Sequence, residues 1–427
     1  MTSDRTYAEA YVWVWLPDAD GPVVAGRLSR SGNQLVFNYG RSYLARPDAI
    51  ALYAPELPLK PGELPLLPGL AMPSCIRDAS PDAWGRRVLI NHRSGANGGA
   101  ATAIELDELT YLLESGSDRA GALDFQLSAT EYVPRLSAGA SLEDLLTASE
   151  KVQRGVPLSL ELDRALRHGT SLGGARPKAQ FDGPDRKFIA KFSVSTDIYN
   201  VVKAEYLAMR LAKKVGLDVA EVQLASTLDK DVLLIERFDR TLHGANWRRR
   251  AMVSALTMLE LDEMMASYAS YEKLAEIIRH RFANPKQTLR ELFGRIVFNI
   301  LAGNTDDHAR NHSAFWDGKT LALTPAYDIC PQSRTGQEAS QAMLIHGGDR
   351  RSQITSCIAA APIFLLGGEE AIDIVNRQVE TIEREWGAIC REAGLSEVDR
   401  NSLWRRQFLN PFAFYDAPDA VRRPSTR

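Results

Sequence analysis

Cysteine and long apolar runs are both scarce in this chain of 427 residues. Its four cysteines stand apart from one another, and none belongs to a C-x-x-C pair. This pattern excludes a disulfide-held mini-domain, fits a reducing compartment and gives no readable zinc or thioredoxin motif. The most apolar segments, residues 296–302 and 359–366, are much shorter than the roughly 18–20 residues that span a bilayer. We therefore expect no membrane partner.

An excess of charge of one sign is missing as well. The chain has 51 Lys and Arg against 54 Asp and Glu, a formal net charge of −3 at pH 7. A dedicated nucleic-acid binder usually carries a basic excess, so free nucleic acid is not expected as the main partner. Residues 1–16 contain Asp4 and Glu9 and lack the basic-then-apolar pattern of a secretory signal. A cytoplasmic location is therefore expected.

The length predicts two to three domains, at about 150 residues per domain. Residues 11–16 and 34–39 are rich in aromatic and β-branched side chains and predict strands. Segments 81–91, 106–115 and 142–153 carry helical patterns. The N-terminal third is therefore predicted to be a small region of both strands and helices.

Strands dominate the middle of the chain. A D-G-P-D turn at 182–185 precedes an alternating strand at 188–192, and a helix is predicted over about 200–215. Two more strands follow, at 219–226 and 232–238.

From about residue 250 onward, almost every periodic segment predicts a helix. Examples are 253–259, 271–281, 287–301 and 371–393. The chain is therefore expected to pass from a mixed region to a strand-rich part and then to an all-helical part.

The residues best suited to chemistry lie at 303–312, which read G-N-T-D-D-H-A-R-N-H and follow a predicted helix. Asp306 and Asn311 have the spacing of the Asp and Asn in the protein-kinase catalytic loop, and Asp328 follows later. In phosphoryl transfer one Asp orients or deprotonates the hydroxyl, while the Asn and the second Asp hold Mg²⁺. The same polar loop is also compatible with a solvated turn or another metal site.

A glycine-rich stretch at 169–178 reads G-T-S-L-G-G-A-R-P-K. Glycines let backbone amides approach phosphate oxygens, and Lys178 could add a positive charge. The stretch is not a Walker A loop, because Ala175 occupies the lysine position. Its G-x-S-x-G spacing also admits a serine-hydrolase elbow, which Pro177 and the following hairpin turn disfavour. A plain flexible loop is the other alternative.

Two further features fit phosphoryl transfer. Lys191 lies on a predicted strand and Glu205 on the next helix, the arrangement whose ion pair holds ATP phosphates in kinases. Residues 236–240, E-R-F-D-R, end the strand-rich part where a kinase has its adenine-binding hinge. Taken singly, a strand lysine is often a solvated edge residue, and a charged strand end needs no special role. Their occurrence in kinase order favours phosphoryl transfer.

On these motifs the sequence resembles the HipA family of bacterial toxin kinases, the toxins of type II toxin–antitoxin pairs. The resemblance covers most of the chain, from about residue 8 to 400. Its strongest stretches are 171–178, 236–240, 304–311 and 325–328. Weaker matches lie at 80–87 and 118–123.

The resemblance implies roles for the catalytic and phosphate-binding positions. Asp306 would be the catalytic base, and Asn311 and Asp328 would be the Mg²⁺ ligands. Lys191, together with Lys178 of the glycine-rich stretch, would contact the ATP phosphates.

It also implies adenine-binding and regulatory positions. Glu236 and Phe238 would offer backbone groups to adenine, and Asp239 would lie near the ribose. Ser171 occupies the family's autophosphorylation position, where the modification is thought to expel the loop from the ATP site. Whether Thr170 is also modified stays open. The remaining ATP-binding positions are Gly173, Gly174 and His308.

The fold implied is α+β and bilobal, like a protein kinase. An N-terminal α/β subdomain is expected at 1–155, a β-rich small lobe at 156–241, an all-α large lobe at 242–415 and a flexible tail at 416–427.

The function implied is a protein serine/threonine kinase toxin that uses ATP and Mg²⁺. It would phosphorylate a protein substrate such as an aminoacyl-tRNA synthetase and arrest growth. A small helix-turn-helix antitoxin of HipB type would be its partner, and DNA would be contacted mainly through that antitoxin. A small-molecule kinase, a catalytically silent corepressor and, more remotely, a serine hydrolase are the alternatives.

Overall fold

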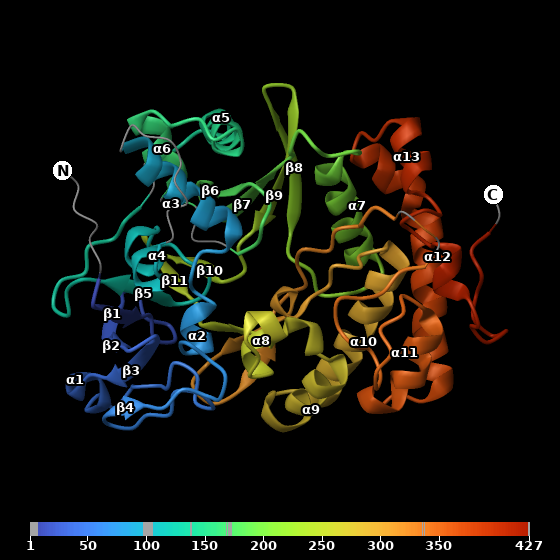
Figure 1. The fold of residues 1–427 in the computed structure, drawn as a ribbon. Coiled ribbons are helices and arrows are strands. Elements are labelled where there is room, and N and C mark those ends of the chain that lie inside the picture. Colours follow the sequence, from blue (N-terminus) through green and yellow to red (C-terminus); the bar gives the residue numbers. More distant parts are fainter. Residues whose placement is uncertain are drawn as a thin grey trace. The chain divides into compact units, whose positions relative to one another are not determined.

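The computed structural model describes residues 7–425 except 97–105, 137–138, 168, 170–172, 335 and 337. Within the described residues the chain forms two compact units, and Figure 1 labels their elements. The first unit comprises the residues up to Val194, Ala225–Val253 and Phe315–Lys319. The second unit comprises Ser195–Leu224, Ser254–Ala314 and the residues from Thr320 onward.

The first unit begins with a five-stranded antiparallel sheet in the order β4-β3-β2-β1-β5. Alternate side chains of a strand point to opposite faces, and the inward set includes the fully buried Val12, Phe37 and Phe125. β3 coincides with the strand predicted at 34–39. The strands are β1 (Glu9–Val14), β2 (Val23–Ser31), β3 (Gln34–Tyr39), β4 (Glu63–Leu64) and β5 (Leu123–Gln126).

A second sheet has the order β6-β7-β9-β8, and the predicted turn at 182–185 joins β6 to β7. Helices and strands share a hydrophobic core that holds Trp84, Leu145, Leu166 and Ala190. The strands are β6 (Lys178–Asp182), β7 (Lys187–Phe192), β8 (Val222–Thr227) and β9 (Lys230–Glu236). The helices that contribute to this core are α3 (Ala83–Ala96), α5 (Leu142–Gln153) and α6 (Leu160–Arg167).

Shorter elements complete the first unit. α1 (Arg41–Leu44), α2 (Ser74–Arg77) and α4 (Glu108–Glu114) are helices of one or two turns. The strands β10 (Arg240–His243) and β11 (Asn246–Arg249) pair as an antiparallel hairpin.

The second unit is mostly helical. Its long helix α12, labelled in Figure 1, packs against α7 and α10 through a buried face that includes Val375, Val379 and Ile382. α9 has the bounds predicted from the sequence. The α-helices are α7 (Val201–Lys214), α8 (Ala255–Met258), α9 (Tyr271–Arg281), α10 (Pro285–Ala302), α11 (Ile354–Ala360), α12 (Gly368–Glu392) and α13 (Glu397–Leu403). The 3₁₀ helices are η1 (Glu263–Tyr268), η2 (Ala309–Asn311), η3 (Ala361–Phe364) and η4 (Pro411–Phe414).

The helix predicted over 253–259 is wrong at its start. Met252–Ser254 is the strand β12, which belongs to a small sheet with β13 (Ser313–Trp316) and β14 (Leu321–Leu323). α8 begins only at Ala255, where the Ser254 side chain caps the helix by accepting from the Thr257 amide. The strand pairs with residues far along the chain, so helical spacing alone could not reveal it.

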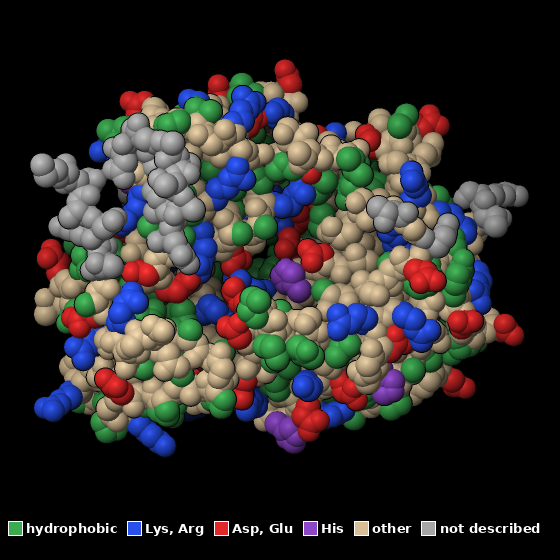
Figure 2. Space-filling model, viewed as in Figure 1, with side chains coloured by type: hydrophobic (Ala, Val, Ile, Leu, Met, Phe, Trp, Pro, Cys, Tyr) green, Lys and Arg blue, Asp and Glu red, His purple; other side chains and the backbone are tan. Residues whose placement is uncertain are grey.

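The mixture of helices and antiparallel sheets places the chain in the predicted α+β class. In the part of the chain that the structure describes, no helix combines the length and apolarity needed to cross a membrane. Basic and acidic side chains are interspersed on the face drawn in Figure 2, as their nearly equal numbers lead one to expect. The predicted domain boundaries at 155/156 and 241/242 stay predictions.

Candidate active site

The candidate catalytic loop begins where α10 ends. α10 stops at Ala302 because Gly303 adopts a left-handed conformation, with φ 70° and ψ 22°. A Cβ atom at this position would lie 2.6 Å from the carbonyl oxygen of Gln407. The Asn304 amide then donates back to the carbonyl of Asn299 at 2.8 Å. Glycine is therefore required here, and the following residues form an irregular loop, as predicted.

Asp306 and Asn311 are linked through the backbone of this loop. The Asn311 Nδ2 donates to the carbonyl of Asp306 at 3.2 Å, and the Asn311 amide donates to the carbonyl of His308 at 2.8 Å. Asn311 is buried, whereas Asp306 is exposed. The arrangement leaves the Asp306 carboxylate accessible to an acceptor and makes Oδ1 the atom of Asn311 that can be offered to a cation.

Asp328 is positioned by the residue that precedes it. The Tyr327 hydroxyl donates to the carbonyl of Arg310 at 2.7 Å and lies 2.7 Å from the Ser313 hydroxyl. Asp328 itself has φ 58°, a left-handed conformation that is uncommon outside glycine. Unusual backbone conformations cluster at functional sites. The strained position of Asp328 therefore agrees with a functional role.

The carboxyl groups of the loop and of Asp328 influence one another. Although the Asp306 residue is exposed, partial desolvation of its carboxyl group raises its pKa; the His308 imidazole opposes that rise, and the negative charges of Asp328 and Asp307 add to it. Close carboxylates repel each other unless a cation joins them. A Mg²⁺ ion is usually held by one or two protein side chains plus substrate phosphates. Asn311 and Asp328 are oxygen donors of the right kind for such an ion.

The described residues contain no group of three or more His, Cys, Asp or Glu that could hold a metal ion by itself.

Asp307, which sequence reasoning missed, anchors the catalytic loop. Its Oδ2 accepts from Asn299 Nδ2 at 2.7 Å and from the Tyr271 hydroxyl, and it lies 3.0 Å from His312 Nε2. Asp307 is 3% exposed and Tyr271 is 1% exposed. Burial alone would raise the pKa of Asp307, but His312 and Tyr271 hold it below its usual value. One buried carboxylate thus ties the loop to α9, to α10 and to the residue that follows η2.

The two predicted phosphate-binding lysines face each other in the first unit. The register of β6 and β7 places Lys178 directly opposite Lys191, and both are buried. Directly opposed residues share a face of the sheet, and like charges in that position are destabilising. Lys178 Nζ also donates to the carbonyl of Gly173. This concentration of positive charge suits a group of phosphate oxygens.

The described end of the glycine-rich stretch contacts Asp82, the residue that precedes α3 in the first unit. Gly174 has φ 104°, and a Cβ atom there would collide with Lys178 Nζ. The Gly174 amide donates to the carboxylate of Asp82, a contact that the sequence analysis did not predict. Ser171 and Thr170, the predicted phosphorylation positions, lie outside the described residues.

The E-R-F-D-R segment forms part of a buried ion network. Asp239 accepts from Arg237 Nε at 3.0 Å, from Arg240 Nη1 at 2.9 Å and from the Gly121 amide at 2.8 Å. Asp118 accepts from Arg237 Nη1 at 3.0 Å and from Arg240 Nε at 2.8 Å. The network joins the D-R-A-G segment at 118–121 to the end of β9. Because Asp239 is engaged with these groups, its proposed place near a ribose stays a prediction.

The other hinge residues are Glu236 and Phe238. The Glu236 carboxylate accepts from Arg186 at 2.7 Å, and the Phe238 ring meets Phe315 edge-on with centroids 5.9 Å apart. The Arg237 amide, between them, donates to the carbonyl of Lys187 at 2.8 Å. The adenine-binding role of this segment stays a prediction.

The two remaining predicted positions are Glu205 and His308. Glu205 is buried on α7 in the second unit, whereas Lys191 belongs to the first unit, so their ion pair stays a prediction. The His308 amide donates to the carbonyl of Asp306 at 2.9 Å, and its buried Nδ1 has no hydrogen-bond partner among the described residues. Its role in ATP binding is likewise a prediction.

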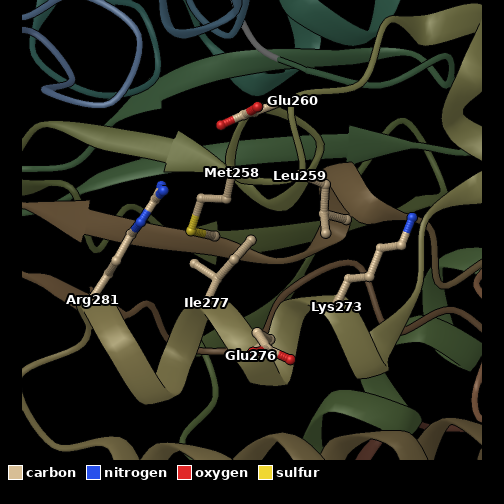
Figure 3. A pocket seen from close by; sticks show the side chains of 7 residues that line it. All are labelled: Met258, Leu259, Glu260, Lys273, Glu276, Ile277 and Arg281. Atoms are coloured by element: carbon tan, nitrogen blue, oxygen red, sulfur yellow. The ribbon is translucent and has the colours of Figure 1, made fainter.

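A pocket of about 240 Å³ lies in the second unit between the end of α8 and the face of α9 (Figure 3). An apolar floor of methionine, leucine and isoleucine is bordered by charges of both signs. The lining residues are Met258, Leu259, Glu260, Lys273, Glu276, Ile277 and Arg281. The predicted catalytic residues are not among them.

Comparison with known proteins identifies the class to which this fold and loop belong. The model of the HipA-like C-terminal domain matches residues 170–386, about half of the chain. The model of the HipA N-terminal domain matches residues 14–126. The chain therefore belongs to the HipA family.

Individual relatives are more distant. The chain is 27% identical over 184 residues to the serine/threonine-protein kinase toxin HipA of Shewanella oneidensis. The matched segment covers 37% of this chain and 42% of that protein. It is 29% identical over 146 residues to the Sinorhizobium fredii kinase homologue Y4mE, 33% of each chain. The matched segments thus span between a third and about two fifths of these curated relatives.

The fold is shared over a greater length. The chain is similar to HipA in the Shewanella oneidensis complex of HipA, HipB and operator DNA, with a TM-score of 0.67 and 19% sequence identity. The match covers 93% of this chain and 95% of that one. The HipA-type, kinase-like α+β architecture predicted from the sequence is therefore confirmed.

Proposed function

We propose that this chain is a protein serine/threonine kinase that transfers the γ-phosphoryl group of ATP, with Mg²⁺, to a protein hydroxyl. The observation that carries the proposal is the catalytic loop. Asp306 is exposed, Asn311 is hydrogen-bonded to the Asp306 carbonyl, and Asp328 is close enough to raise the pKa of Asp306. Phosphoryl transfer depends on such positioning and on electrostatic stabilisation more than on covalent chemistry.

In the proposed reaction, Asp306 accepts a hydrogen bond from the acceptor hydroxyl and takes its proton as the oxygen attacks the γ-phosphorus. The bond from the γ-phosphorus to the bridging oxygen breaks, and ADP is the leaving group. Asn311 Oδ1 and the Asp328 carboxylate hold Mg²⁺, which neutralises charge on the phosphate oxygens. Asp307 keeps the loop backbone fixed, so Asp306 need not reorganise during the transfer.

Most of the residues proposed to bind the nucleotide belong to the first unit, and Glu205 and His308 belong to the second. The facing pair Lys178 and Lys191 supplies two buried cations to the α- and β-phosphates. Glu236 and Phe238 offer backbone groups to adenine, with Asp239 toward the ribose and Glu205 paired with Lys191. Gly173, Gly174 and His308 complete the proposed contacts.

The biological role proposed is that of the toxin in a type II toxin–antitoxin pair. The target is a protein of translation such as an aminoacyl-tRNA synthetase, the location is cytoplasmic, and Ser171 is the autophosphorylation site. The partner is a small helix-turn-helix antitoxin, through which DNA is contacted. Support comes from the family membership and from the shared fold with HipA, which was solved together with HipB and operator DNA.

The experiment that tests the activity incubates the purified chain with γ-labelled ATP, Mg²⁺ and a cell lysate. Labelled protein is expected with the wild type and should fall by about 10²-fold or more with Asp306→Asn, the scale attributed to general acid–base groups. The exposed Asp373 on α12 offers the matched control, Asp373→Asn, which should label like the wild type. Equal labelling with Asp306→Asn would contradict the proposal.

The same reaction distinguishes the acceptors. Mass spectrometry of the labelled chain should find phosphate on Ser171, and Ser171→Ala should remove it without removing transfer to lysate proteins. Label found only in small molecules would favour a small-molecule kinase. Nucleotide binding without transfer would favour a silent corepressor.

A further inference from the structure

The segment that follows Asp328 contains a cation with little compensation. Arg334 has its Nε and Nη1 atoms buried, and neither has a hydrogen-bond partner among the described residues. Its Nη2 reaches only the Ser352 hydroxyl, at 3.5 Å. Burial lowers the pKa of Arg334, and within the described ranges no carboxylate opposes that effect.

Removing an unpaired guanidinium from water lowers the stability of the folded protein. A charge removed from water is retained in proteins when it is paired and hydrogen-bonded. Other buried arginines of this chain follow that rule: Arg119 pairs with Asp124, and Arg237 pairs with Asp118. Arg334, a residue of intermediate exposure with two buried nitrogen atoms, has no such carboxylate among the described residues. Its planar fork of donors matches an oxyanion that can accept two parallel hydrogen bonds.

The neighbours of Arg334 are neutral hydrogen-bonding groups. Ser352 is fully buried, and Gln341, 2% exposed, donates through Nε2 to the Ser352 hydroxyl at 3.1 Å. The Gln341 Oε1 is buried and has no partner within the described part of the chain. The Ser352 hydroxyl accepts from Gln341 and from Arg334, so its own proton is available to a further acceptor. A guanidinium and a hydroxyl can therefore donate to one anion from different directions.

This group of side chains lies beside the candidate catalytic loop. The Gln332 amide donates to the carbonyl of Gly303 at 2.9 Å, and the Ala342 amide donates to the carbonyl of Thr305 at 3.1 Å. The chain on both sides of Arg334 is therefore attached to the backbone that leads into Asp306.

We propose that Arg334, together with the Ser352 hydroxyl that Gln341 positions, binds a phosphate group. Phosphate fits better than a carboxylate because it is tetrahedral and carries up to two negative charges, which suits donors that converge from several directions. The group can come from inorganic phosphate or from a phosphorylated serine side chain. The proposal does not depend on catalysis and extends beyond the proposed kinase activity.

The test measures equilibrium unfolding in EDTA, with and without inorganic phosphate, at constant ionic strength set with chloride. EDTA removes binding that depends on Mg²⁺. For the wild type, phosphate at about ten times its Kd should lower the unfolding constant about tenfold by mass action. For Arg334→Met the shift should vanish. Without phosphate this variant should be as stable as the wild type or more stable, because an uncompensated buried charge is gone.

Matched variants keep the result interpretable. Arg334→Lys retains the charge but loses the fork, so its response to phosphate should be weaker than that of the wild type. Arg406→Met removes an exposed arginine of the same unit and should respond like the wild type. If Arg334→Met does not fold, the comparison of Arg334→Lys with Arg406→Met decides the question.

The source of the phosphate is tested with a phosphoserine peptide and the same peptide carrying serine. Stabilisation by inorganic phosphate, by the phosphopeptide or by both, each lost in the Arg334 variants, supports the site and names its ligand. Equal stabilisation of the wild type and the Arg334 variants, or none by either ligand, overturns the proposal. Transfer activity is measured separately, so that a failure here is distinct from a failure of the kinase proposal.

Discussion

Lys178 and Lys191 are direct cross-strand partners on β6 and β7, and both side chains are buried. Two ammonium groups in opposed positions repel each other. Such a pair is expected where an anion of higher charge binds between them. The relationship is the clearest feature of the first unit that points to the phosphates of a nucleotide.

Replacing either lysine should weaken ATP binding. For Lys191→Met we expect the Kd for ATP to rise at least tenfold, because one of the two cations that face the phosphates is lost. Titration calorimetry with ATP measures the affinity, and chemical denaturation checks that the variant is folded. Lys60→Met, at an exposed position of the same unit, should leave the affinity unchanged. Unchanged ATP affinity in both Lys178→Met and Lys191→Met would remove the lysines from the proposed site.

Asp307 should contribute to both stability and catalysis. Removing one member of a buried hydrogen-bonded charge group costs ~3–5 kcal/mol, so Asp307→Ala should unfold at much lower denaturant than the wild type. Asp307→Asn keeps the shape and should cost less, ~1–3 kcal/mol. In that folded variant kcat should fall while the KM for ATP changes little, because the loop and not the nucleotide site is disturbed. A normal kcat in Asp307→Asn would show that the anchor is purely structural.

The ion network of Asp118 and Asp239 predicts a loss of stability in acid. Burial alone would raise the pKa of Asp118, but Arg237, Arg240 and other cations hold it well below its usual value, and the pKa of Asp239 is lowered for the same reason. A carboxyl with a lowered folded pKa contributes stability above the unfolded value of 3.8, and that stability is lost as the pH falls below it.

Denaturation curves between pH 6 and pH 3 check this prediction. Wild-type stability should hold near pH 6 and decline as the pH approaches and falls below 3.8, and Asp118→Asn should be less stable at pH 6 with a shallower decline. A parallel decline in both proteins would mean that the network does not titrate as described.

Gly303 should tolerate no side chain. An alanine there would adopt a left-handed conformation, which costs ~1–2 kcal/mol, and its Cβ would also collide with the Gln407 carbonyl. Gly216 has φ 94°, and a Cβ atom there would meet nothing within 4 Å, so Gly216→Ala isolates the conformational cost. Gly303→Ala should therefore lose clearly more unfolding free energy than Gly216→Ala. Equal losses would show that the backbone near Gln407 yields freely.

Local features of the fold were accessible from the sequence. The helices at 142–153 and 271–281 have the predicted bounds because their signals lie within a few residues. The strand at 252–254 was missed because its partners lie far along the chain. Long-range pairing has no local signal of this kind.

The candidate site likewise combines features that local sequence patterns predict with features that depend on long-range contacts. The spacing of Asp306, Asn311 and Asp328 is a sequence pattern, whereas the anchoring role of Asp307 depends on Tyr271 and Asn299, which the fold brings to it. The sequence did contain a signal for the role of Asp307, because two adjacent aspartates repel each other when both are exposed or both are buried without cations. The pair at 306–307 therefore suggests that one carboxylate is exposed and the other is held by buried partners. Counting outward from a turn at 182–185 would have placed Lys178 opposite Ile189. In the structure Asp182 lies opposite Lys187, so the register is shifted and Lys178 faces Lys191 instead.

The most direct measurement follows the labelled γ-phosphoryl group of ATP after reaction with the wild type and with Asp306→Asn, and counts it in protein, in small molecules and as inorganic phosphate. The account predicts label on protein hydroxyl groups with the wild type and almost none with Asp306→Asn, although both bind ATP equally well. Label absent from protein in both, or present equally in both, would contradict the assignment of Asp306 as the catalytic base of a protein kinase.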